Sequence, residues 1–204
     1  MRVTQALLRN AQQRPTALAT ACEGRQHNWR ELADRVARYA QVLRTLGLLP
    51  GDRVGIVALN SDHYLETFYA VPWAGGIIVP INTRWSKPEI AYALADADIR
   101  LLIVDEQFAA LVGELAAESG LTVLGLGATT GTGIANVETL LAQATPAPEA
   151  GRAGDDVAGI FYTGGTTGRS KGVMLTHTNH VTNSLQLAAM MQAPEELSLS
   201  LIHI

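Results

Sequence analysis

A short segment in the last quarter of the chain gathers residue types that bind polyphosphate. Four glycines, three threonines and one lysine lie within Tyr162-Thr163-Gly164-Gly165-Thr166-Thr167-Gly168-Arg169-Ser170-Lys171-Gly172-Val173. Glycines let backbone N–H groups approach an anion closely, because they lack a Cβ and accept positive φ. Threonine hydroxyls add short donors, and a lysine adds a compact positive charge. We therefore predict a site for ATP or phosphate formed by Thr163, Gly164, Gly165, Thr166, Thr167, Gly168, Lys171 and Gly172.

The residues that flank this segment are apolar and predict that the loop joins two buried strands. Ala158-Gly159-Ile160-Phe161 precede it, and Val173-Met174-Leu175 follow it. A P-loop would instead open a helix after Gly-Lys-Ser or Gly-Lys-Thr, whereas Lys171 stands between a serine and a glycine. A dinucleotide-binding loop is excluded too, since no G-x-G-x-x-G opens a helix after the first strand. A solvated hairpin turn rich in Gly and Thr remains the alternative to a phosphate site.

This segment closely resembles the phosphate-binding signature of the adenylate-forming enzymes, the superfamily of acyl-CoA synthetases, luciferases and adenylation domains of peptide synthetases. The family pattern is an aromatic residue, Thr, Ser or Gly, Gly, Ser or Thr, Thr, Gly, a variable pair and Lys-Gly, and residues 162–172 match it position by position. The family commonly has proline where this chain has Ser170, and often serine where it has Gly164. The Thr-Gly-Gly-Thr-Thr-Gly form is similar to that of the acyl-CoA synthetase branch.

Three upstream segments extend the resemblance to the fatty-acyl and aryl-CoA ligases. They are Gly51-Asp52-Arg53-Val54-Gly55-Ile56, Asn60-Ser61 and Val79-Pro80-Ile81-Asn82-Thr83-Arg84. The resemblance runs from about Trp29 to Leu187 and does not include residues 195–204. It does not extend to the family's aromatic-Gly-x-Thr-Glu segment, its ribose-binding aspartate, its hinge or its C-terminal catalytic lysine. We therefore expect the chain to be an N-terminal fragment of a longer enzyme.

The resemblance implies an AMP-forming carboxylic acid–CoA ligase, which activates its acid as an acyl-adenylate and transfers the acyl group to coenzyme A. The implied cofactors are ATP, Mg²⁺ and coenzyme A, and the implied substrate is a small carboxylic acid, as in fatty acid metabolism. No catalytic residue is assigned within these 204 residues, which we expect to be inactive alone. His177 is interpreted as the first residue of a helix packed beneath the loop, where it could contact the substrate region. The alternatives are a stand-alone nucleotide- or phosphate-binding module and a non-catalytic remnant.

The composition excludes several other classes of protein. A hydrophobic fraction of 48% and a charged fraction of 17% suit a folded core. A net charge of −4 offers no basic surface for nucleic acid. The single cysteine, Cys22, cannot form an internal disulfide, which fits the reducing cytoplasm as the predicted location. No apolar run is long enough to cross a membrane, and the pair His177 and His180 lacks further ligands, so no metal site is predicted.

Helix and strand patterns alternate along the first part of the chain and predict a mainly parallel sheet with helices on its faces. The expected helix starts are Asn28 with Glu31, Ser61, and Ser86 with Glu89; a further helix is expected over 108–117, and Thr176 or Thr178 begins the last one. The expected strands are 54–59, 77–81, 101–104 and 121–126. Four acids, Asp96, Asp98, Asp105 and Glu106, are interpreted as helix-end and turn residues.

Two polar or proline-rich stretches, 129–136 and 144–156, are expected to be loops. We use the second to divide the chain into an N-terminal α/β region of an AMP-binding domain (1–143), a linker loop (144–156), and the phosphate-loop segment with its following helix (157–204).

Overall fold

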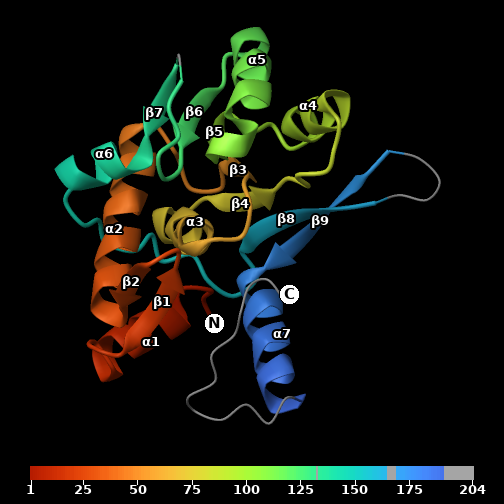
Figure 1. Ribbon diagram of the computed structural model, residues 1–204. Coiled ribbons are helices and arrows are strands. Elements are labelled where there is room, and N and C mark those ends of the chain that lie inside the picture. Colours follow the sequence, from red (N-terminus) through yellow and green to blue (C-terminus); the bar gives the residue numbers. More distant parts are fainter. Residues whose placement is uncertain (132, 165–168, 191–204) are drawn as a thin grey trace.

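The computed structural model describes residues 1–131, 133–164 and 169–190, and a seven-stranded sheet lies at its centre (Figure 1). The strand order is β7-β6-β5-β3-β4-β8-β9, and all neighbours are parallel except β8 and β9. The strands are β3 (Arg53–Val57), β4 (Ile77–Pro80), β5 (Leu101–Val104), β6 (Thr122–Gly125), β7 (Ile134–Asn136), β8 (Val157–Thr163) and β9 (Lys171–Thr176). The predicted fold class, a mainly parallel sheet followed by a strand–loop–strand segment, is confirmed.

Helices cover both faces of this sheet (Figure 1). One face packs against α1 (Gln5–Gln13), α2 (Trp29–Thr45), α3 (Asp62–Ala74) and α6 (Val137–Gln143). The other packs against α4 (Lys87–Asp96) and α5 (Ala109–Ser119), which follows the short 3₁₀ helix η1 (Glu106–Phe108). A two-stranded hairpin, β1 (Leu18–Cys22) and β2 (Arg25–Asn28), leads into α2, and α7 (His177–Met190) follows β9.

The strand β5 shows why the apolar runs form a sheet that is buried on both faces. Leu101 and Ile103 belong to the core beneath α2 and α3, whereas Leu102 and Val104 belong to the core beneath α4 and α5. Successive side chains of a strand point to opposite faces, so an uninterrupted apolar run fills both cores.

The predicted helix starts are confirmed by their caps. Asn28 accepts from the Glu31 backbone N–H at 2.9 Å while the Glu31 carboxylate accepts from the Asn28 N–H. Ser61 accepts from the N–H of Tyr64, and the Ser86–Glu89 capping box is also present. Of the two candidates for the last helix, Thr176 is the cap, since its Oγ1 accepts from the Asn179 N–H.

The prediction of a loop over 129–136 is wrong at its C-terminal end, because residues 134–136 form β7 at the edge of the sheet. A three-residue strand is too short to show a period in the sequence. Asn136 then begins α6, which the sequence did not predict, by accepting from the Thr139 N–H. The β1–β2 hairpin was not predicted either. The stretch 144–156 contains no helix or strand, as expected, although it packs closely, with Trp73 Nε1 donating to the Ala147 carbonyl.

Among the described residues, no helix has both the length and the apolar character that a membrane span requires.

Candidate phosphate-binding site

The predicted phosphate loop connects β8 and β9, which form a hairpin that projects from the end of the sheet (Figure 1). Thr163 pairs directly with Lys171, and Thr163 Oγ1 donates to the Lys171 carbonyl at 3.4 Å. Both residues are exposed, as is Gly164. The hairpin therefore presents a threonine hydroxyl and a lysine side by side at its loop end, where the two strands join the predicted phosphate loop. The other predicted loop residues, Gly165, Thr166, Thr167 and Gly168, lie outside the described residues.

The topology places this loop end of the hairpin at the edge of the sheet where ligands bind in parallel sheets. The strand β8 runs parallel to β4, with Gly159 beside Ile78. Thr163, the last residue of β8, therefore lies at the edge of the sheet that is formed by the carboxyl ends of the parallel strands. Ligands of open α/β sheets bind at that edge, in crevices beyond the strand ends.

Gly172 has a packing role that the sequence could not reveal. A Cβ on Gly172 would lie 2.8 Å from Ile160 Cγ2 and 3.3 Å from Tyr162 Cζ. Its absence lets β9 approach the side chains of β8. Gly164 differs, because a Cβ there would meet no atom within 4 Å.

The prediction that both strands of the hairpin are buried is wrong for β9. In β8, Ala158 and Gly159 are buried, but the first four residues of β9 are exposed, including Met174 at 67%. The physical reason is the strand order, in which β9 is the edge strand and, among the described strands, pairs with β8 alone.

His177 is the first residue of α7, as predicted, but it does not lie beneath the loop. The base of the hairpin pairs Thr176 with Val157, so His177 lies at the opposite end from Lys171. It is 1% exposed, and its Nδ1 accepts from the Val3 N–H at 3.2 Å. Burial lowers the pKa of this imidazole below its ordinary value. Its suggested contact with substrate stays a prediction that this position does not favour.

One group of acidic and histidine side chains in the described part of the chain could hold a metal ion: His63, Glu66 and Glu138, whose ligand atoms lie within 4.8 Å of one another. Arg35 already binds both carboxylates, at 2.5 Å from Glu66 Oε1 and 2.6 Å from Glu138 Oε1. Mg²⁺ prefers oxygen ligands that keep their negative charge available, and this group lies among α2, α3 and α6, away from the hairpin. It therefore does not fit the magnesium ion that accompanies ATP.

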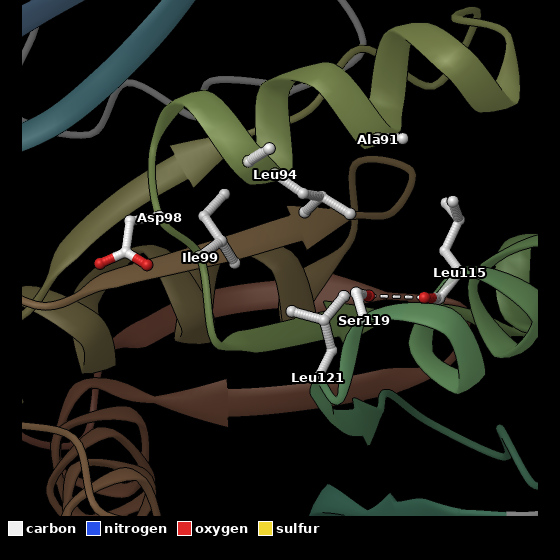
Figure 2. Close-up of a pocket in the computed structure, with 8 residues that line it drawn as sticks. Ala91, Leu94, Asp98, Ile99, Leu115, Ser119 and Leu121 are labelled. Atoms are coloured by element: carbon white, nitrogen blue, oxygen red, sulfur yellow. Dashed lines mark hydrogen bonds between the residues drawn. The ribbon is translucent and has the colours of Figure 1, made fainter.

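A small hollow lies between α4 and α5 (Figure 2). Its volume is about 250 Å³, and its lining is mostly apolar, with Leu94, Ile99, Leu115 and Leu121 around it. The hydroxyl of Ser119 is taken up by the Leu115 carbonyl. Asp98, Ile99 and Leu121 precede the starts of β5 and β6, so the hollow lies at the amino edge of the sheet, opposite the carboxyl edge.

A parallel sheet that ends in a Gly- and Thr-rich hairpin with a lysine beside the loop is the arrangement expected of a nucleotide-binding enzyme domain. The chain belongs to the family of AMP-binding enzymes, whose family model matches residues 7–202. The predicted membership of the adenylate-forming superfamily is thereby confirmed.

Relatives with known names cover most of this chain. It is 38% identical over 180 residues to a feruloyl-CoA synthase of an Amycolatopsis species, which covers 88% of this chain and 34% of that protein. It is 34% identical over 168 residues to the fatty acid–[acyl-carrier-protein] ligase ScoC of Streptomyces coeruleorubidus, covering 82% of this chain and 31% of ScoC. The chain thus spans about a third of the length of the curated relatives it matches.

Solved structures show the same fold. The anthranilate CoA ligase AuaEII, in complex with anthranoyl-AMP, superposes with a TM-score of 0.83 at 25% identity, over 91% of this chain and 36% of that one. ATP-bound MatB from Rhodopseudomonas palustris superposes with a TM-score of 0.79 at 35% identity, over 93% of this chain and 38% of MatB.

Proposed function

We propose that this chain is part of an ATP-dependent, AMP-forming carboxylic acid–CoA ligase and that its β8–β9 hairpin binds the phosphates of ATP. The observation that carries the proposal is the pairing of exposed Thr163 with exposed Lys171 at the carboxyl edge of the sheet, within a chain matched by the AMP-binding family. The names of the feruloyl-CoA and anthranilate-CoA relatives support CoA as the acyl acceptor.

In the proposed reaction, a carboxylate oxygen of the acid attacks the α-phosphorus of ATP. The bond to the β-phosphate oxygen breaks, and pyrophosphate leaves with the electron pair. The thiol of coenzyme A then loses its proton, its sulfur attacks the acyl carbon, and AMP leaves. Lys171, the Thr163 hydroxyl and the backbone N–H groups of the hairpin would hold the β- and γ-phosphates and balance the charge that builds on pyrophosphate. Phosphoryl transfer depends mainly on such positioning and charge stabilisation.

The chain provides the phosphate-binding part of this reaction and no catalytic residue that we assign. Magnesium would accompany ATP, but we assign it no ligand in this chain. We further propose that the acid is a small molecule, that the protein acts in the cytoplasm, and that residues 144–156 link the α/β region to the phosphate-loop segment. On this proposal the 204 residues bind ATP or pyrophosphate and do not form acyl-adenylate.

The chain offers a matched control, because it contains two lysines, Lys171 and Lys87. Lys87 lies on α4, where it pairs with Glu114 at 3.0 Å. Titration calorimetry with ATP and with pyrophosphate should show binding that Lys171→Ala weakens at least about tenfold, as expected for the loss of a charged contact, and that Lys87→Ala leaves unchanged. Lysine acetylation followed by mass spectrometry should show that ATP protects Lys171 and not Lys87.

Equal binding by Lys171→Ala and the wild type would favour the non-catalytic remnant. Carboxylate-dependent ATP–pyrophosphate exchange by the purified chain would contradict the assignment of catalysis to residues outside it.

A further inference from the structure

The hairpin that carries the proposed phosphate site is tied to helix α4 by a hydrogen bond from its first strand. The Tyr162 hydroxyl donates to Asp96 Oδ2 at 2.6 Å and lies 3.5 Å from the Ala93 carbonyl. The Tyr162 ring also meets Trp85 edge to face, with centroids 6.0 Å apart. Burial and the neighbouring Asp96 carboxylate raise the pKa of Tyr162 above its ordinary value, so the phenol keeps the proton it donates.

Asp96 is an unexpected residue at its own position in the helix. It is the last residue of α4, where the partial negative charge of the helix C-terminus disfavours a carboxylate. Two hydroxyls stabilise this carboxylate: Tyr92 donates to Oδ1 at 3.3 Å, and Tyr162 donates to Oδ2. Asp96 therefore joins α4 to β8 and is more than the helix-end acid that the sequence indicates.

The segment that leads into β9 also reaches α4. The guanidinium carbon of Arg169 lies 5.2 Å from the centre of the Tyr92 ring, within the range of a cation–π contact. Tyr162 directly precedes the predicted phosphate-binding residues, and Arg169 stands two residues before β9, so one helix contacts the chain on both sides of the loop.

Helix α4 is a firm support for these contacts. Its Ile90, Ala93 and Leu94 are buried in the core, and the capping box of Ser86 and Glu89 sets its first turn. The exposed strand β9 provides no comparable support.

We propose that Asp96 and Tyr92 are positioning residues of the phosphate site. Asp96 holds Tyr162, and Tyr92 holds Arg169. Together these contacts set the separation of the two chain segments, on either side of the loop, from which Thr163 and Lys171 reach a phosphate. The inference rests on the proposed function for its consequence in binding, but the contacts themselves can be tested without nucleotide. Loss of either contact should weaken phosphate binding by about three- to tenfold, because it raises the free-energy cost of ordering the hairpin.

The first measurement is amide hydrogen exchange on the nucleotide-free protein. Tyr162→Phe keeps the ring against Trp85 and removes the donor, and Asp96→Asn weakens the acceptor. Both variants should speed exchange at Thr163, Lys171 and Gly172, and leave β3 and β5 unchanged. Asp34→Asn, which alters an exposed helical carboxylate paired with Arg38 on α2, is the matched control and should change none of these amides. Unchanged exchange in Tyr162→Phe and Asp96→Asn would overturn the proposal.

The second measurement is the dissociation constant for ATP and pyrophosphate. Tyr162→Phe, Asp96→Asn and Tyr92→Leu should each bind more weakly than the wild type and Asp34→Asn, with unchanged unfolding midpoints. Faster exchange without weaker binding would overturn the positioning role. If the wild type itself binds neither ligand, the proposed phosphate site fails, and the exchange result alone decides whether α4 anchors the hairpin.

A double-mutant comparison separates the two roles that Arg169 could have. If Arg169 acts through Tyr92, then Arg169→Gln combined with Tyr92→Leu should bind no more weakly than Tyr92→Leu alone, since Tyr92→Leu already removes the ring that Arg169 contacts, together with the hydroxyl that donates to Asp96. A further loss in the double variant would show that Arg169 touches phosphate itself and would overturn the part assigned to Tyr92.

Discussion

Two regions of the molecule differ in which side chains they bury: one buries charged side chains, and the other exposes apolar ones. On the face covered by α2, α3 and α6, the carboxylate of Glu66 is 1% exposed as a residue and both its oxygens accept from Arg35. On β9 and α7, large apolar side chains are exposed instead, with Met174 at 67% and Leu185 at 60%. In the first region, the buried carboxylate is paired within the region by Arg35, which joins α2 to α3 and α6. In the second, β9 pairs with β8, the hairpin meets α4 through Tyr162 and Arg169, and α7 meets the N-terminal segment through His177.

The histidines of the two regions also differ in the direction of their pKa shifts. The Glu66 carboxylate, 3.8 Å from His63 Nδ1, raises the pKa of His63 despite its burial. Burial lowers the pKa of His180 on α7, and it lowers that of His177 as well. Stability near neutral pH should therefore respond to acid with opposite signs in the two regions.

The largest expected effect is the loss of the cation in the first region. Arg35→Ala would leave Glu66 buried without its cation, and removing one member of a buried ion pair costs about 3 to 5 kcal/mol. Urea unfolding should measure this loss. Arg100→Ala is the control, because Arg100 is 86% exposed in its contact with Asp98, and it should cost no more than about 0.5 kcal/mol. A loss in Arg35→Ala as small as that of the control would show that the network contributes little.

A smaller effect is expected from adding a methyl group to a glycine in the buried part of the sheet and to a glycine of the hairpin. In β3, a Cβ on Gly55 would lie 2.7 Å from Leu102 Cδ1 and 3.2 Å from Ile99 Cγ2, so Gly55→Ala should overpack the core and cost about 1 to 3 kcal/mol. Gly164→Ala in the hairpin meets open space and should change the unfolding free energy by no more than about 0.5 kcal/mol. Equal effects of the two changes on the urea midpoint would contradict the contrast in packing.

The acid response of His63 gives the third prediction. A histidine whose folded pKa is raised contributes stability that is fully present below its ordinary value of 6.5 and is lost as the pH rises through the raised value. Burial alone would raise the pKa of Glu66, but the neighbouring His63 and the hydrogen bonds from Arg35 lower it, so this carboxylate stays charged through that window. The wild type should therefore exceed His63→Gln in stability by more at about pH 5.5 than at about pH 8.5.

His177→Gln provides the comparison of sign. The folded pKa of His177 is lowered, so the wild type should lose stability as the pH falls below 6.5, and the variant should lack that loss. Parallel pH profiles for the two variants would contradict the opposite shifts.

The smallest effect on stability is expected on the exposed strand. Met174→Gln should change the unfolding free energy by no more than about 0.5 kcal/mol, because the side chain is already 67% exposed. The same change should reduce self-association in sedimentation experiments, since exposed apolar patches promote contact between molecules. An unaltered sedimentation profile would show that β9 does not mediate such contact.

Much of the fold could be predicted because its signals are local. The caps at Asn28, Ser61 and Ser86 depend on residues three positions apart, and the run at 101–104 identifies a strand from its neighbours alone. The strand β7 and the helix α6 were not predicted, since three residues show no period and β7 forms by pairing with β6.

The candidate site was predictable to a similar extent. Thr163 and Lys171 lie on opposite strands of a short hairpin, so their spacing along the chain indicates that they come together. The same hairpin explains why His177 does not lie beneath the loop, because β9 reverses the chain and carries the next residue back to the base. The contact between Asp96 and Tyr162 could not be predicted from the residues around Asp96 in the sequence, which indicate only the end of a helix.

By itself, the sequence determined the order of helices and strands, most of their ends, and the hairpin that presents Lys171, because periodicity, capping and turn chemistry act over a few residues. Only the tertiary structure decided that Arg35 meets Glu138 and that Tyr162 meets Asp96, pairs separated by 103 and 66 residues. Contacts between distant side chains follow from the order of the strands and from which helix covers each face, and both depend on the packing of the whole chain.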